Sequence, residues 1–179
     1  MEIEAKFRVK DFSGLEKALS RAEFVGEMSE EDVYYDLGKE DRVLRLRIRD
    51  MDGRRSMILT LKIKKNNKGV MVVDERECEV GEGIAEILEG LGFKQFFKKS
   101  KKRRTFVLDG VSVNLDDVDG LGKFVELEFI GDQNDGEIKL KEVARKLGLD
   151  WDERIVDTYM AMLQASERKA IKPEKPKKK

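Results

Sequence analysis

The chain begins with nine residues, MEIEAKFRV, in which polar and apolar side chains alternate. Glu2, Glu4, Lys6 and Arg8 occupy one set of alternate positions, and apolar residues fill most of the other. Because successive side chains of a β-strand point to opposite faces, this pattern predicts a strand over 1–9 with one charged and one apolar face. Taken alone, such a strand fits equally an edge that faces water and the wall of a charged cavity.

The same alternation recurs along the rest of the chain. Hairpin-turn signals separate the segments, among them the Asp-Gly pairs at 52–53 and 109–110. We therefore expect strands at 30–37, 42–50, 57–65 and 70–80, and a three-stranded meander within 99–131. Apolar residues at helical spacing predict helices at 11–24, 84–93, 137–147 and 151–164.

These elements together predict an α+β fold. The amphipathic helices need apolar surface to pack against, and the strands offer it on one face only. With the helices outside, the charged faces turn toward each other, and we expect about eight strands to close into an antiparallel β-barrel with a polar, charged lumen. Charges buried in such a lumen are tolerated if acids pair with bases or bind a charged ligand.

Composition limits the possible functions. Charged residues make up 41% of the 179 residues and hydrophobic residues 40%, while Lys plus Arg and Asp plus Glu each number 37. This balance leaves no overall field to attract nucleic acid or an acidic membrane. The chain has no histidine and one cysteine, which excludes an internal disulfide, a zinc site of the usual Cys/His kind and a His-based triad.

The length fits one domain, which we place at 1–165, followed by a Lys-rich tail at 166–179 that we expect to be disordered. We find no signal peptide and no long apolar run, so we expect a cytoplasmic protein. The density of Lys, Glu and Arg is typical of a hyperthermophile. The sequence leaves the oligomeric state, monomer or homodimer, open.

The charged faces carry both signs, and each sign suggests a ligand. Clustered Arg and Lys match the oxygens of a polyphosphate, Arg through its planar fork and Lys as a point charge. Clustered carboxylates match Mg²⁺ or Mn²⁺, which bind carboxylates together with substrate phosphates. A lumen lined by both predicts a site for a metal–triphosphate complex, in which Glu2 and Glu4 hold the metal and Lys6 contacts phosphate.

The segment EIEAK at 2–6 matches the ExExK signature of the triphosphate tunnel metalloenzymes, also called the CYTH superfamily. Further segments resemble the family in the same order, namely RLRIR, LTLKIK, ERECE, KKRRTFVLDGVSVNLDDVDGLGKFVELEF and DTYMAML. The resemblance covers residues 1–164 and is nearest to the class IV adenylate cyclase-like branch. It implies the closed triphosphate tunnel that the strand pattern also predicts.

The resemblance implies roles residue by residue. It implies metal ligands at Glu2, Glu4, Glu126 and Glu128, with Asp116 beside the metal. The bases that it implies for phosphate binding are Lys6, Arg45, Arg47, Lys62, Lys102 and Arg104. Glu75 and Glu77 match the acidic strand of the family, although ERECE contains a third alternating acid, Glu79, and the sequence does not decide which two face the site.

The resemblance also implies Mg²⁺ or Mn²⁺ as the cofactor and ATP or another triphosphate as the substrate. Attack of the ribose 3′-hydroxyl on the α-phosphorus gives cyclic AMP and pyrophosphate. Attack of water on the terminal phosphorus makes the protein a triphosphatase of a nucleoside, thiamine or inorganic triphosphate instead. A non-catalytic binder of polyphosphate or 5′-triphosphate RNA is the third interpretation, and the full set of carboxylates argues against it. We expect no membrane partner and no nucleic-acid partner.

Overall fold

The computed structural model describes residues 2–39, 41–67 and 70–171, without the side chains of 2, 64–67, 70–73, 133–134 and 167–171. The chain divides into two compact units. Unit 1 comprises Met1–Val25 and Thr105–Lys179, and unit 2 comprises Gly26–Arg104.

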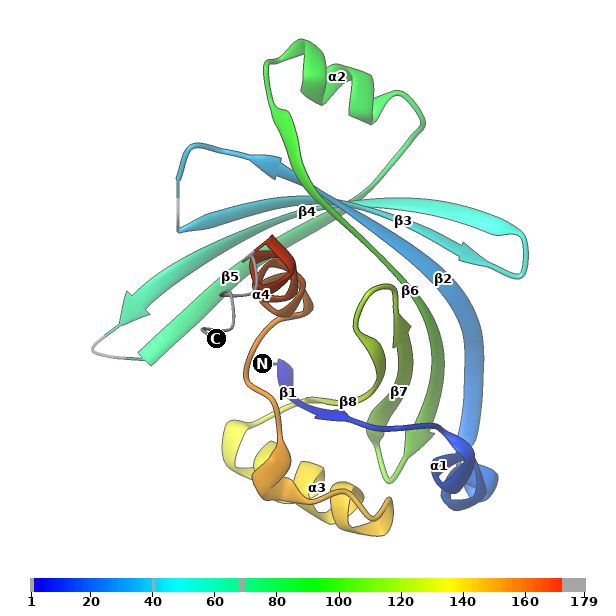
Figure 1. Ribbon diagram of the computed structural model, residues 1–179. Coiled ribbons are helices and arrows are strands. Elements are labelled where there is room, and N and C mark those ends of the chain that lie inside the picture. Colours follow the sequence, from blue (N-terminus) through cyan, green and yellow to red (C-terminus); the bar gives the residue numbers. More distant parts are fainter. Residues whose placement is uncertain (1, 40, 68–69, 172–179) are drawn as a thin grey trace, which may run out of the picture. The chain divides into compact units, whose positions relative to one another are not determined.

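Eight strands form one sheet in the order β1-β8-β7-β6-β2-β3-β4-β5 (Figure 1). Their bounds are β1 Glu2–Arg8, β2 Glu23–Asp36, β3 Arg42–Met51, β4 Arg54–Asn67, β5 Val70–Val80, β6 Lys94–Leu108, β7 Val111–Val118 and β8 Gly122–Ile130. The pairings described between neighbouring strands are antiparallel. Strands β1 and β5 stand at the two ends of this order, and no pairing joins them among the described residues, so closure into a barrel is not confirmed.

Unit 1 places its main hydrophobic core on the apolar face of β1, β8 and β7. Ala5, Val113 and Leu127 come from the three strands, and they pack against Leu140 and Val143 of α3 (Gln133–Lys146). The short helix α1 (Ser13–Ala18) and the 3₁₀ turn η1 (Leu19–Arg21) complete this core. The alternation predicted from the sequence is thus confirmed, with the apolar positions facing helices.

The last helix, α4 (Tyr159–Ile171), lies on the other side of β1 and β8 from α3 (Figure 1). It follows the 3₁₀ turn η2 (Trp151–Glu153), and its first residue, Tyr159, packs on Phe124 and Val118 in a second small core. Phe124 shares its face of β8 with charged residues rather than with the main core. The expectation that the helices pack only on the apolar faces is therefore wrong for α4.

Unit 2 also has an apolar and a charged face. Val33 of β2 and Leu44 and Leu46 of β3 form its apolar core with Leu88 of α2 (Ile84–Gly90). Strand β2 is much longer than the predicted 30–37 segment. Its first half, from Glu23, lacks a clear apolar alternation, so the sequence pattern does not predict it as a strand.

Two hairpin turns confirm the Asp-Gly signals. Asp52 and Gly53 both have positive φ, 54° and 74°, between β3 and β4, and Asp109 and Gly110 have 53° and 75° between β6 and β7. Positive φ at both central residues is the type I′ geometry, whose twist matches that of the flanking strands. These two turns set the register of the charged side chains described below.

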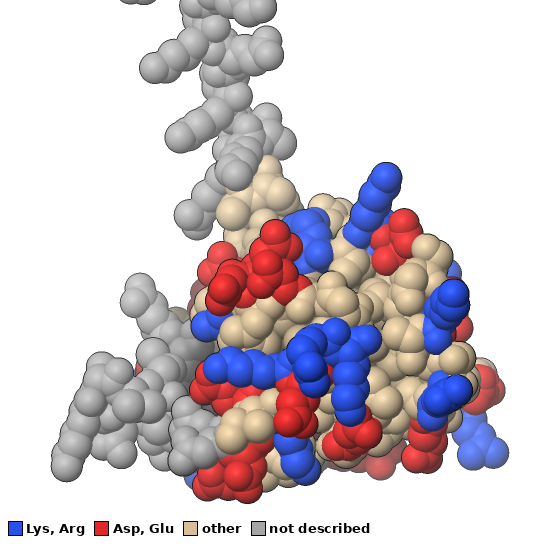
Figure 2. Space-filling view, turned by 90° about the horizontal axis from the view of Figure 1, so that it is seen from below, with Lys and Arg blue, Asp and Glu red and all other residues tan. Residues whose placement is uncertain are grey.

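Three further observations bear on the sequence-based expectations. Helix α4 extends to Ile171, into the predicted 166–179 tail, and residues 172–179 lie outside the described part of the chain. Within the described residues, every helix is too short or too polar to cross a bilayer. Acidic and basic side chains lie side by side over the surface shown in Figure 2, as the equal numbers of the two signs lead one to expect.

Candidate functional site

The charged face of unit 1 is a grid of side chains from three strands. The antiparallel registers of β1 with β8 and of β7 with β8 align alternate residues into rows. The three rows, each in the order β1, β8, β7, are Glu4–Glu128–Ser112, Lys6–Glu126–Asn114 and Arg8–Phe124–Asp116. Side chains directly opposite each other on neighbouring strands are within contact distance.

Three carboxylates of this grid converge. Oxygens of Glu4, Glu126 and Glu128 all lie within 4.8 Å of one another, and the three side chains are exposed, buried and half-buried in that order. Carboxylate oxygens are the ligands that Mg²⁺ and Mn²⁺ prefer, and a partly open set leaves room for phosphate oxygens. The residues present therefore fit such an ion. The side chain of Glu2, the remaining predicted ligand on β1, lies outside the described part of the chain.

Lys6 lies directly beside the carboxylates. Its side chain is almost fully buried, with Nζ 3.0 Å from Oε1 of Glu126 and 4.4 Å above the ring centre of Tyr159. The ion pair and the aromatic ring both stabilise the ammonium group in this buried position. The predicted phosphate-binding lysine and a predicted metal ligand are thus in contact.

Asp116 belongs to the third row and is fully buried. It accepts a hydrogen bond of 3.0 Å from the hydroxyl of Tyr159, and it is not one of the three converging carboxylates. Tyr159 therefore bridges two parts of the predicted metal region, since its ring lies under Lys6 and its hydroxyl holds Asp116.

The charged face of unit 2 centres on two acids of β2 that the sequence analysis missed. Asp32 accepts from Nε and Nη2 of Arg47 at 2.7 and 3.0 Å, and Nζ of Lys99 lies 2.9 Å away. Burial alone would raise the pKa of Asp32, but the hydrogen bonds from Arg47 and the nearby cations hold it far below its ordinary value. Burial and the Asp32 charge raise the pKa of Tyr34 to about 12.

Glu30 forms the second centre. Nη2 of Arg49 lies 2.8 Å from its Oε1, and Nζ of Lys101 lies 3.3 Å from its Oε2. Burial alone would raise the pKa of Glu30, but the charges of Lys101, Arg47 and Arg103, with the Arg49 hydrogen bond, lower it below its ordinary range. Both acids of β2 are thus ionised and hold a row of bases in place.

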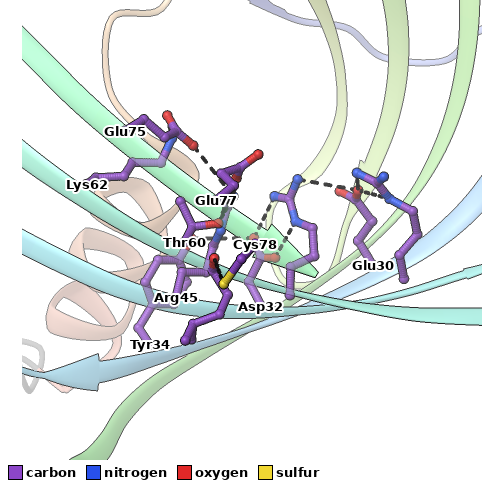
Figure 3. Close-up of polar contacts among 12 residues, drawn as sticks. Glu30, Asp32, Tyr34, Arg45, Thr60, Lys62, Glu75, Glu77 and Cys78 are labelled. Carbon is purple, nitrogen blue, oxygen red and sulfur yellow. Dashed lines mark hydrogen bonds and ion pairs between the residues drawn. The ribbon is translucent and has the colours of Figure 1, made fainter. Parts of the chain in front are cut away.

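A third group joins β3, β4 and β5 (Figure 3). Nη2 of Arg45 donates to Thr60 at 3.0 Å and to Glu77 at 3.1 Å, and the Thr60 hydroxyl donates to the same Glu77 oxygen at 2.7 Å. Lys62 and Glu75 pair at 2.8 Å. Burial alone would raise the pKa of Glu77, but the Thr60 hydrogen bond, together with Glu75, Arg45 and Lys62, lowers it.

The arrangement in unit 2 suits an anion with several oxygens. The guanidinium and ammonium groups lie along one face of adjacent strands, and Nε of Arg45 is buried without a hydrogen-bond partner in the described part of the chain. Burial and the Lys101 charge lower the pKa of Lys99, against the opposing effect of Asp32. Phosphate oxygens would satisfy such donors and offset the crowding of positive charge.

Within unit 2 the predicted bases Arg45, Arg47 and Lys62 share the charged face, but the other two predicted bases lie differently on β6. Lys102 is exposed and Arg104 is half-buried, on the strand face opposite to the buried residues of the same segment. The buried bases, which the sequence analysis missed, are Lys99, Lys101 and Arg103. The sequence contained a signal for these buried bases, because Phe106 and Leu108 pack on the apolar core. Since side chains alternate along a strand, residues 102 and 104 lie on the same face as Phe106 and Leu108, and residues 99, 101 and 103 lie on the other.

Comparison with known proteins gives a consistent result. The model of the CYTH domain matches residues 1–159. A protein of Methanocaldococcus jannaschii named "putative adenylate cyclase MJ0240" is 29% identical over 175 residues, which cover 90% of this chain and 98% of that protein. Adenylate cyclase CyaB of Aeromonas hydrophila is 25% identical over 177 residues, covering 92% of this chain and 90% of that protein. The solved structure of the PH1012 protein from Pyrococcus horikoshii OT3 has a TM-score of 0.77 and 30% identity, covering 91% of this chain and 99% of that one.

Proposed function

The chain belongs to the CYTH domain family, and on this premise we propose that it is a divalent-metal-dependent enzyme acting on the triphosphate of a nucleotide. The reaction that we propose first is conversion of ATP to cyclic AMP and pyrophosphate. Two relatives that carry adenylate cyclase in their names, similar over nearly the whole chain, support this choice. The closed tunnel predicted from the sequence remains part of this proposal.

The observation that carries the proposal is the convergence of Glu4, Glu126 and Glu128. These side chains would hold Mg²⁺ or Mn²⁺, and the ion would neutralise the charge of phosphate oxygens. Lys6, in contact with Glu126, would contact a phosphate oxygen from the same row. Phosphoryl and nucleotidyl transfer depend mainly on positioning and charge stabilisation, which these residues supply without a histidine.

The bases of unit 2 have the second role in the proposal. Arg45, Arg47 and Lys62 are paired with acids in the described structure, so their side chains are already oriented. Oriented cations stabilise the charge that develops on a leaving pyrophosphate without a reorganisation cost. We propose that they bind the phosphate chain of the substrate, and the family resemblance supports this.

Hydrolysis of the terminal phosphate is the second candidate. The residues of the site favour it, because the carboxylates suit a metal ion and the bases suit phosphate groups. Every triphosphate offers these groups, whatever its base or sugar. Water would then replace the ribose hydroxyl as the nucleophile, with the same charge stabilisation.

A product assay tests the proposal. The protein is incubated with ATP, and separately with inorganic triphosphate, each with Mg²⁺ or Mn²⁺, and the products are identified by phosphorus NMR. Glu126→Gln and Glu4→Gln are expected to lower the rate about 100-fold or more, and Glu142→Gln, an exposed position on α3, serves as the control. Cyclic AMP with pyrophosphate supports the cyclase, and orthophosphate supports the triphosphatase. Equal or absent turnover in wild type and Glu126→Gln would refute the metal assignment.

A further inference from the structure

Asn114 of β7 is a buried amide next to the converging carboxylates. It is 2% exposed, and it lies in the same row as Lys6 and Glu126. Its Oδ1 accepts a hydrogen bond of 2.8 Å from the hydroxyl of Thr105. This bond fixes the orientation of the amide, so that its Nδ2 group points away from Thr105.

The Nδ2 group has no hydrogen-bond partner in the described part of the chain. A buried amide donor without an acceptor is costly and rare in folded proteins, so this group is expected to find its acceptor in a water molecule or a ligand. The neighbouring acceptor in the row, Oε1 of Glu126, is engaged by Lys6. The two hydrogens of Nδ2 are therefore suited to an acceptor that arrives with the substrate.

The adjacent row is more open than the row of Asn114. Glu4 is exposed, and Glu128 and Ser112 are half-buried, whereas Lys6, Glu126 and Asn114 are all buried. A phosphate group entering over the open row would meet the carboxylates through an ion and would border Asn114 on the next row. A neutral amide suits this position, because it donates to a phosphate oxygen without competing for the ion.

We propose that Nδ2 of Asn114 donates a hydrogen bond to a non-bridging phosphate oxygen of the bound triphosphate and thereby positions the substrate beside the carboxylates. This inference rests on the proposed function. It adds a neutral side chain to a site that is otherwise made of charges, and it assigns the Thr105 hydroxyl the task of orienting that side chain.

The test compares Asn114→Leu and Asn114→Asp with wild type in two binding measurements. Calorimetry with inorganic triphosphate in the presence of Mg²⁺ reports substrate binding, and Mn²⁺ titration alone reports the metal site. We expect both variants to bind triphosphate about 10-fold to 100-fold more weakly than wild type, as for loss of a hydrogen bond to a charged group. Asn114→Asp should bind more weakly than Asn114→Leu, because its carboxylate repels phosphate. Mn²⁺ affinity of Asn114→Leu should stay within about 2-fold of wild type, because Asn114 is not a metal ligand.

Thermal unfolding gives a readout that separates substrate binding from folding. Without ligand, Asn114→Leu should melt within about 5 °C of wild type, because removal of the unsatisfied donor offsets loss of the hydrogen bond from Thr105. The rise in Tm on adding triphosphate should shrink in the variant. Asn114→Ala, which removes the donor without adding apolar bulk, replaces Leu if that variant does not fold.

The possible outcomes separate the two proposals. If wild type binds triphosphate and the Asn114 variants bind it equally well, the role of Asn114 is refuted and the proposed function stands. If wild type binds no triphosphate, both the proposed function and the role of Asn114 are refuted. Weaker triphosphate binding with unchanged Mn²⁺ binding and an unchanged ligand-free Tm supports the inference.

Discussion

Arg47 and Asp32 form a two-point ion pair across neighbouring strands, with Nε and Nη2 of the guanidinium 2.7 and 3.0 Å from the two carboxylate oxygens. Asp32 is fully buried, and the side chain of Arg47 is 13% exposed. Because both charges are withdrawn from water, their mutual contact and the Lys99 contact keep either from being isolated. Asp32 therefore organises the bases of β3 and β6 around it.

Removal of Asp32 should destabilise the fold. Asp32→Ala leaves Arg47 and Lys99 as buried charges without this partner, and breaking a buried pair from one side costs about 3–5 kcal/mol. Glu31→Ala, one residue earlier and exposed, should change stability by less than about 0.5 kcal/mol. Urea unfolding of the three proteins measures the difference. Equal midpoints for Asp32→Ala and wild type would contradict the structural role.

The same carboxylate predicts a pH dependence of stability. Because the folded pKa of Asp32 lies below its ordinary value of 3.8, Asp32 stabilises the fold above that value, and this contribution is lost as the pH falls toward the folded pKa. Below pH 3.8 the unfolding free energy should fall by up to about 1.4 kcal/mol per pH unit for this group. Asp32→Asn should show a shallower slope in urea titrations between pH 2 and 5, and an identical slope would argue that other acids dominate.

Lys101 and Lys102 offer a matched pair on β6. Lys101 is buried against Glu30, and Lys102, the residue that the family resemblance implied, is exposed. Lys101→Met should raise KM for the triphosphate by about 10-fold or more, since it removes an oriented cation. Lys102→Met should change KM by less than about 2-fold. Steady-state kinetics measures both KM values, and urea unfolding shows whether each variant is folded. A larger increase in KM for Lys102→Met than for Lys101→Met would favour the register of β6 expected from the sequence.

The ring and the hydroxyl of Tyr159 make separate contacts, and two substitutions can test them one at a time. Tyr159→Phe keeps the ring beneath Lys6 but removes the donor to the buried Asp116, which should cost about 1–3 kcal/mol of stability. Tyr159→Leu also removes the ring that packs on Phe124 and should cost more. Guanidinium unfolding measures both, and a Phe variant as stable as wild type would mean that Asp116 is satisfied by other groups.

Much of the fold follows from local pattern. The alternation of Leu44, Leu46 and Ile48 with Arg45 and Arg47 predicts both a strand and its two faces, and the structure confirms it. The Asp-Gly turns predict the hairpins because few residues tolerate positive φ. The convergence of Glu4 with Glu126 and Glu128 follows from the pairing of β1 with β8. The family resemblance implied this pairing, but periodicity alone does not predict it.

The missed residues have a common physical reason. In the β6 segment KKSKKRR, bases occupy both faces, so alternation of charge gives no register, and only the later Phe106 and Leu108 define it. In β2, Glu30, Glu31 and Asp32 are three consecutive acids, and the sequence does not show which of them are paired with bases across the sheet. Long-range pairing decides burial in both segments.

The two faces of unit 2 also affect how its stability varies with temperature. Exposure of apolar surface raises the heat capacity on unfolding, and exposure of polar surface lowers it. One face of unit 2 buries Val33, Leu44 and Leu46, and the other buries ion pairs such as Asp32 with Lys99. Exposure of the second face on unfolding adds little to the heat-capacity change. The unfolding free energy should therefore vary less with temperature than that of an equally large domain with two apolar faces. Since the cost of dehydrating charges also falls on heating, the side chains proposed to bind phosphate would keep the protein folded over a broad range of temperature.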